Sequence, residues 1–400
     1  MLYANNIEKL LGLQGVEIKN TEEVNGKIIL SVEMYKQKQF CPRCGVTTGN
    51  VHDYREQMIK DAPAFGKHFV IKLRKRRYHC SACGKHFAEK NDWLPRYHRM
   101  TNRLSAYVID KLRETRTYAS VSREVNLSIT TVMRIFDLVN YSPQTLPEVI
   151  GIDEFKGNTG RDKYQCIITD IKNARVLDIL PTRYKHELYS YFKGFERSNT
   201  THFVSDMWDA YEDIARTFFK KATFIVDKYH YARQVFWAFE SVRKEEQKKH
   251  CKDNRLLFKR SKRLLTKRYE LLKPDEKKTV DYILCISDPL LHAHNLKEDF
   301  YNILKCKDRD TAKKMLSDWI LYAQESEIPR FIECTNTFIN WSDGILNSFT
   351  CSYTNGFTEG CNNKIKVLKR TAYGYRNFKR FRNRILHIFS DKNMQKSGAV

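Results

Sequence analysis

The spacing of hydrophobic residues along the chain changes from a two-residue to a helical period and back again. Near the N-terminus, hydrophobic and polar residues alternate at 15–20 and 27–35, which predicts two strands joined by a turn at 24–26. A short helix is predicted before them at 7–11. Alternation returns at 67–79, where apolar residues are interleaved with basic ones. The N-terminal part is therefore predicted to be mainly β.

Helical spacing dominates residues 101–140, which are predicted to form three short helices. Ser128 is a predicted N-cap of the third helix. A helix, a short turn and a capped helix indicate a helix-turn-helix, although small helical bundles share this pattern. The exposed face of the third helix would present Thr130, Thr131 and Arg134 to a DNA groove.

The next part of the chain alternates strands with helices, which indicates a mixed α/β sheet. The predicted elements are strands at 148–155, 164–170 and 175–180, a helix at 186–195, a strand at 202–205, a helix from 208, and a strand at 222–226 followed by a helix. Between about 229 and 340 only helical periodicity remains.

The charge of the chain indicates a nucleic-acid partner. The 71 Lys and Arg residues exceed the 47 Asp and Glu residues, giving a net charge of +24, and basic side chains that neutralise phosphates dominate such binding. The excess is clustered at 243–268, where it forms either a track for the DNA backbone or a solvated helical face. The sequence contains no apolar run long enough for a membrane span and no signal-peptide pattern, so we expect a cytoplasmic, nucleoid-associated protein.

Two Cys-x-x-Cys pairs supply four thiolates for one structural Zn²⁺. They are Cys41 with Cys44 and Cys80 with Cys83, and a glycine follows each pair. Two unrelated pairs or a redox motif are the alternative reading, and His52, His79 and His86 are alternative ligands. A zinc ribbon with an enlarged hairpin is expected, and its cationic block is predicted to bind DNA through Arg74, Lys75, Arg76 and Arg77.

Acidic residues occupy positions in the α/β part that strands seldom tolerate. Asp153 and Glu154 interrupt an apolar strand, while Asp206 and Asp227 directly follow later strands. Reactive groups gather at the carboxyl ends of the strands in α/β sheets. Carboxylates clustered there provide the oxygen ligands that Mg²⁺ prefers. Alternation places Asp153 and Glu154 on opposite faces, so we expect only one of them to join Asp206 and Glu359. Asp209, one helical turn further on, competes with Asp206.

Several of these motifs together resemble the ISL3-type bacterial insertion-sequence transposases, which are DDE enzymes of the RNase H-like superfamily. The resemblance rests on CPRCG, YHCSACGKHF, GIDEF, IVDKYHY and SYTNGFTEGCNNKIKVLKRTAYGYRNF. It implies that Asp153, Asp206 and Glu359 form a catalytic triad binding two Mg²⁺ or Mn²⁺ ions. It also implies cleavage and strand transfer of double-stranded DNA, with terminal inverted repeats and target as substrates, by a homo-oligomer (a dimer) on paired ends.

The same resemblance gives the expected domains and the supporting residues. The domains are a zinc-binding domain at 1–97, a helix-turn-helix at 98–145, an RNase H-like catalytic domain at 146–228 and 345–392, and a helical insertion at 229–344. Asp227 is either a motif residue together with His230 or an N-cap. Asn355 and Asn362 are expected to orient Glu359 or to contact phosphate. The DNA end is expected to be held by Lys364, Lys366, Lys369 and Arg370.

Two other functions compete with transposition. A zinc and helix-turn-helix regulator with an inert α/β domain would be expected to lack one or more of the triad acids, and all three are present. An RNase H-like nuclease without strand transfer would use the same metal site. The long helical insertion and the two DNA-reading modules favour the transposase.

Overall fold

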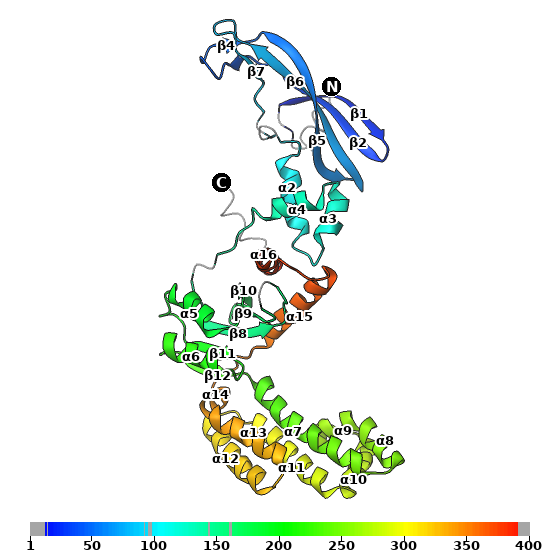
Figure 1. Cartoon of the computed structure of the whole chain (residues 1–400), viewed down its shortest axis with the longest axis vertical. Helices are drawn as coiled ribbons and strands as arrows, with labels where there is room; N and C mark the ends of the chain where they lie inside the picture. Colours follow the sequence, from blue (N-terminus) through cyan, green and yellow to red (C-terminus); the bar gives the residue numbers. More distant parts are fainter. Residues whose placement is uncertain are drawn as a thin grey trace. The chain divides into compact units, whose positions relative to one another are not determined.

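The computed structural model describes most of the 400-residue chain (Figure 1). The described residues are 13, 15–91, 93–94, 98–142, 145–159 and 162–390. The helix predicted at 7–11 lies outside them. The chain forms two compact units, of which the first contains the residues up to Tyr141 together with Leu368–Tyr373 and Asn383–Ile388. The second unit contains the remainder.

The first unit begins with a five-stranded sheet in the order β1-β2-β6-β5, with β7 paired to β6. Its strands are β1 (Val16–Val24), β2 (Lys27–Met34), β5 (Val51–Ala64), β6 (Lys67–His79) and β7 (His86–Ala88), and the short strands β3 (Gln39–Phe40) and β4 (Thr47–Thr48) pair separately. The long β5–β6 hairpin is the expected enlarged hairpin. β1 continues four residues beyond the predicted end, past an irregularity between Ile18 and Asn20.

Three short helices follow in the same unit, as predicted. They are α2 (Asn102–Lys111), α3 (Tyr118–Val125) and α4 (Ile129–Phe136). The Ser128 side chain accepts a hydrogen bond from the Thr131 amide and so caps α4. Asn126 adopts a left-handed conformation (φ 51°) that ends α3. The apolar stripes of the three helices form one shared core.

The end of the chain contributes a buried cation to this unit. Arg384, in α16 (Phe378–Phe389), has no exposed surface, and its guanidinium donates to the carbonyl oxygens of Leu112, Glu114 and Arg116. These three carbonyls lie at or beyond the C-terminus of α2, where no further helical turn supplies amides to bond them. Arg384 therefore stabilises the loop between α2 and α3.

The second unit contains the predicted mixed sheet, in the order β10-β9-β8-β11-β12. Its strands are β8 (Val149–Phe155), β9 (Gln165–Asp170), β10 (Arg175–Leu180), β11 (His202–Ser205) and β12 (Thr223–Val226). The first three pair antiparallel, whereas β11 lies parallel to both β8 and β12. This is an RNase H-like sheet. Helices α5 (Lys185–Lys193) and α6 (Asp209–Phe218) form a core with one face, and α15 (Gly356–Thr371) lies against the other face.

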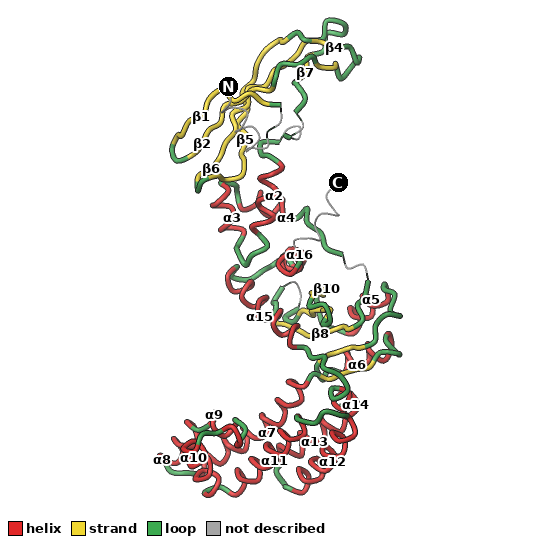
Figure 2. The backbone as a smooth tube through the Cα atoms, turned by 180° about the vertical axis from the view of Figure 1, so that it is seen from behind, coloured by secondary structure: helices red, strands yellow, loops and turns green. Residues whose placement is uncertain are grey.

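A helical region is inserted between β12 and α15 (Figure 2). Its helices are α7 (Lys228–Lys249), α8 (Lys252–Arg260), α9 (Lys262–Thr266), the 3₁₀ turn η1 (Tyr269–Leu271), α10 (Pro274–Cys285), α11 (Asp288–Leu304), α12 (Arg309–Glu325), α13 (Pro329–Asn340) and α14 (Ser342–Asn347). They share one large hydrophobic core. Strands are absent from 228–347, all of which is described, so the predicted helical content is confirmed. None of the helices in the described part of the chain is long and apolar enough to cross a bilayer.

Candidate active site

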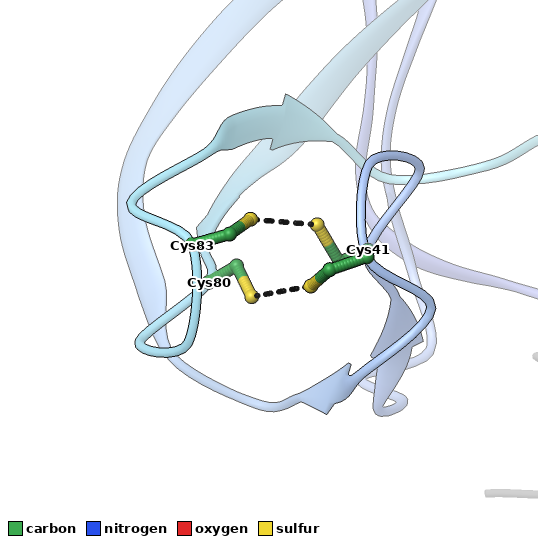
Figure 3. Close-up of side chains that lie close together, drawn as sticks. Cys41, Cys80 and Cys83 are labelled. Atoms are coloured by element: carbon green, nitrogen blue, oxygen red, sulfur yellow. Dashed lines mark hydrogen bonds between the residues drawn. The ribbon is translucent and has the colours of Figure 1, made fainter.

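The four predicted zinc ligands converge at one point of the first unit (Figure 3). Sγ of Cys41 lies 3.5 Å from Sγ of Cys83, and Sγ of Cys44 lies 3.5 Å from Sγ of Cys80. A tetrahedral Zn²⁺ with Zn–S bonds of about 2.3 Å requires S–S separations of about 3.8 Å. The cysteines therefore fit a Zn²⁺ ion with only small adjustments.

The backbone around these cysteines forms two matching turns. The amide of Gly45 donates to the Cys41 carbonyl at 2.9 Å, and the amide of Gly84 donates to the Cys80 carbonyl at 2.8 Å. Both glycines have a positive φ, +74° and +70°, which other residues adopt with difficulty. These turns direct both thiols of each pair toward the same centre.

The four basic residues at 74–77 of β6 differ in their exposure and in their partners. Arg74 is half-exposed, pairs with Glu33 at 2.8 Å and lies over the Tyr54 ring. Lys75 is partly buried, and Arg77 pairs with Asp53 at 2.9 Å. Arg76 is only 6% exposed and forms ion pairs with Glu33 at 2.8 Å and Glu89 at 3.4 Å. The prediction that Arg76 contacts DNA is wrong, because its charge is used inside the protein.

The third helix of the helix-turn-helix does present the predicted face. Thr130 and Arg134 are exposed and Thr131 is partly exposed. The Ser128 hydroxyl contacts the Thr130 and Thr131 hydroxyls at 2.9 and 2.8 Å. Arg134 is therefore the side chain of this face that projects a charge into solvent.

The basic residues of α15 differ in their exposure. Lys364, Lys366 and Arg370 are exposed, whereas Lys369 is partly buried. Nζ of Lys364 lies 5.0 Å from the ring centroid of Phe389. Three of the four predicted cations therefore remain available to an anionic partner.

Three carboxylates meet at the ends of β8 and β11. Ligand oxygens of Asp153, Glu154 and Asp206 all lie within 4.8 Å of one another. The expectation that only one of the two adjacent acids could join Asp206 is wrong. The side chains of Asp153 and Glu154 contact different elements, but Asp206, which directly follows β11, lies close to both of them.

Each of the two adjacent acids is held by a different helix or loop. Oδ2 of Asp153 accepts a hydrogen bond from Asn362 of α15 at 2.9 Å. Glu154 is ion-paired with Arg183 at 2.8 Å and accepts a hydrogen bond from the Tyr211 hydroxyl at 3.4 Å. Arg183 was missed from the sequence, because no motif marks it. Its guanidinium also lies over the Trp208 ring at 3.6 Å.

The pKa values of Asp153 and Asp206 are both raised. Burial, followed by the charge of Glu154, raises the pKa of Asp153 to about 7. Burial, followed by the charges of Glu154 and Asp153, raises the pKa of Asp206 to about 8. Oδ1 of Asp206 is buried and has no hydrogen-bond partner among the described residues. This set of oxygens fits a hard divalent cation such as Mg²⁺.

A second group lies nearby and contains Glu359. Ligand atoms of Asp227, His230 and Glu359 also lie within 4.8 Å of one another, and Nε2 of His230 is 3.6 Å from Oε1 of Glu359. Asp227 caps α7 by accepting from the Tyr229 amide, which confirms the N-cap reading. The charges of Glu359 and Asp227 both contribute to the raised pKa of Asp153. The two groups are therefore electrostatically coupled, although Glu359 is not grouped with Asp206.

Burial lowers the pKa of His230, so the imidazole is neutral at pH 7. Burial and the Asp227 charge raise the pKa of Glu359. A neutral imidazole supplies no positive charge to these acids, and the charges of Arg233 and Lys366 offset only part of the rise in the pKa of Glu359.

Comparison with known proteins agrees with this architecture. Family models match residues 37–83 (zinc-finger of transposase IS204/IS1001/IS1096/IS1165), 89–140 (helix-turn-helix domain of transposase family ISL3) and 150–385 (transposase, the ISL3-type DDE family). The chain is 26% identical over 393 residues to the transposase for insertion sequence element IS1001 of Bordetella parapertussis, covering 94% of this chain and 96% of that protein. It is also 26% identical over 257 residues to the transposase for IS1557 of Mycobacterium tuberculosis, covering 57% of this chain and 56% of that protein.

The order of zinc ribbon, helix-turn-helix and catalytic region is the same in the sequence, the structure and the family matches. The catalytic family model alone spans more than half of the chain. This protein therefore belongs to the ISL3 family of insertion-sequence DDE transposases.

Proposed function

We propose that Asp153, Asp206 and Glu359 are the metal ligands with which this transposase cleaves the ends of its insertion sequence and joins them to target DNA. The observation that carries this proposal is the cluster of carboxylate oxygens from Asp153, Glu154 and Asp206, all within 4.8 Å of one another at the edge of the sheet, where the pKa of Asp153 is raised to about 7 and that of Asp206 to about 8. Two Mg²⁺ or Mn²⁺ ions held there would stabilise the negative charge that develops on the attacking and leaving oxygens.

Neighbouring residues neutralise charge beside the proposed ligands and fix their orientation. Arg183 neutralises Glu154, which therefore supports the site beside the ligands. Asn362 and the Glu154 amide both donate to Asp153 and fix its carboxylate. One buried oxygen of Asp206 has no hydrogen-bond partner within the described part of the chain and is available to a cation. Water would break one P–O bond at the element end, and the released 3′-hydroxyl would then form a P–O bond to target DNA as another breaks.

The DNA ends would be read by the N-terminal modules. Thr130, Thr131 and Arg134 of α4 would enter a groove of the terminal inverted repeat. Arg74 and the exposed cations of α15 would contact phosphates. Pairing of the two ends by a dimer, the domain boundaries expected from the sequence and residence on the nucleoid belong to the same proposal.

The test is cleavage of a labelled duplex that carries the terminal repeat of the element. Asp206→Asn should abolish Mg²⁺-dependent cleavage while leaving binding of the duplex unchanged. Asp209→Asn is a matched control, because Asp209 is an exposed acid one helical turn away, and it should cleave normally. Normal cleavage by Asp206→Asn would refute the proposed ligand set.

A further inference from the structure

One face of α15 is polar where a helix packed on a sheet is usually apolar. Asn355, Thr358, Glu359 and Asn362 follow one another at spacings of three, one and three residues, which places them on the same side of the helix. Asn355 and Thr358 have no exposed surface, and Asn362 is 5% exposed. We call Asn355, Thr358 and Asn362 the polar docking face of α15.

Asn355 stands at the N-terminus of α15 but does not cap it with its side chain. Its carbonyl accepts from the Glu359 amide, as an N-cap carbonyl does. Its side-chain amide instead donates to the Ile152 carbonyl of β8 at 3.0 Å, and its backbone amide donates to Oδ1 of Asp227 at 2.8 Å. One residue thus joins α15 to the strand of Asp153 and to the start of α7.

The other two members continue the attachment on either side of Glu359. The hydroxyl of Thr358 bonds that of Thr169 in β9 at 2.8 Å. Nδ2 of Asn362 donates to Oδ2 of Asp153 at 2.9 Å. These four hydrogen bonds therefore connect two turns of α15 to β8, to β9 and to the start of α7.

Glu359 itself has no comparable support. Its side chain is 36% exposed, and its contact with His230 is 3.6 Å long, which is longer than a hydrogen bond. Apolar packing tolerates small slides and rotations of a helix, whereas a buried hydrogen bond is lost over a few tenths of an ångström. The position of the Glu359 carboxylate therefore depends on how the polar docking face fixes its helix.

We propose that Asn355, Thr358 and Asn362 are positioning residues that set Glu359 against Asp153 and thereby set the affinity of the site for divalent cations. This inference rests on the proposed function, since it takes Glu359 and Asp153 as ligands. Residues that orient metal ligands without binding the metal typically change affinity by about 10- to 100-fold when replaced. We expect an effect near the lower end for Asn355, because two other attachments remain.

The test measures Mn²⁺ binding to the full-length protein directly, by electron paramagnetic resonance of the free ion, with zinc already bound. Asn355→Ala should weaken Mn²⁺ binding about tenfold, and Thr358→Val, which keeps the side-chain volume, should weaken it in the same direction. Asn347→Ala is the matched control. Its side-chain amide donates to the Phe224 carbonyl of β12 at 2.8 Å, a bond of the same type to the same sheet but away from the acids.

Three results would overturn the inference. They are wild-type Mn²⁺ affinity in both Asn355→Ala and Thr358→Val, an equal loss of affinity in Asn347→Ala, or an absence of Mn²⁺ binding by the wild-type protein. Thermal unfolding of each variant separates weakened binding from a failure to fold, and Thr358→Val provides the answer if Asn355→Ala does not fold. If wild type binds Mn²⁺ as expected but does not cleave DNA, the proposed function fails while the positioning role stands.

Discussion

Replacing Asp153 with asparagine should stabilise the metal-free protein at pH 8, although it removes a proposed metal ligand. The folded state raises the pKa of Asp153 from 3.8 to about 7. A raised pKa means that the folded state binds the proton more tightly, so this contribution to stability is present below pH 3.8 and is lost as the pH rises through 7. Three pKa units correspond to about 4 kcal/mol, which is the upper limit of the gain.

An opposing cost reduces this gain. The Asp153 carboxylate accepts one hydrogen bond from the Glu154 amide at 2.7 Å and one from Asn362 at 2.9 Å. Asparagine offers only one oxygen, so its NH₂ group would face one of these donors at a cost of about 1–3 kcal/mol. Rotation of the Asn362 amide by half a turn relieves part of that cost, because its own Oδ1 has no hydrogen-bond partner among the described residues. We expect a net gain of about 2 kcal/mol.

Urea unfolding at pH 5 and pH 8, with EDTA or with excess Mg²⁺, measures both effects. Without metal, Asp153→Asn should be more stable than wild type at pH 8, and the difference should shrink toward pH 5. Mg²⁺ should stabilise wild type more than the variant. If the variant is the less stable protein at pH 8 in EDTA and shows the wild-type pH dependence, the electrostatic reasoning is refuted.

Further predictions concern sites outside these acids. Cys41→Ser should lose the one Zn²⁺ per chain that mass spectrometry should find in wild type, and a zinc-free but fully folded wild type would disprove the ribbon. Arg76→Ala should lower stability by about 3 kcal/mol because it leaves the buried Glu89 without an ion-pair partner among the described residues, while Glu33 keeps Arg74; an unchanged urea midpoint would contradict this. Arg134→Ala should weaken duplex binding and reduce the salt slope by about 1, whereas an unchanged slope would exclude a phosphate contact. Burial lowers the pKa of His294 to about 3, so stability should fall as the pH drops from 6.5 toward 3, and His294→Leu should remove much of this loss; equal pH slopes would refute it.

Features encoded by a few neighbouring residues were predictable from the sequence. The Cys-x-x-Cys pairs and the Ser128 cap each depend on local geometry that a short segment determines. The strands and helices of the second unit followed from periodicity for the same reason. The place of Asp206 beside Asp153 was predictable because Asp206 directly follows a strand.

Features that depend on distant partners were not predictable. Arg74 and Arg76 lie two residues apart on one face of β6 and both pair with Glu33 of β2, yet of the two only Arg76 is buried, where it also pairs with Glu89, the residue that follows β7. Glu154 reaches Asp206 because of where β11 ends relative to β8, which alternation along one strand does not describe. The parallel pairing of β2 with β6 likewise joins segments that β3, β4 and β5 separate in the sequence.

The central claim is that Asp153, Asp206 and Glu359 act together on DNA, although Glu359 lies in the neighbouring group with Asp227 and His230. The direct test is Mg²⁺-dependent cleavage of the terminal repeat by Glu359→Gln, which keeps the size of the side chain and removes its charge. We predict that Glu359→Gln binds the duplex as wild type does and cleaves it at no detectable rate. Cleavage at the wild-type rate would show that the triad assignment is wrong.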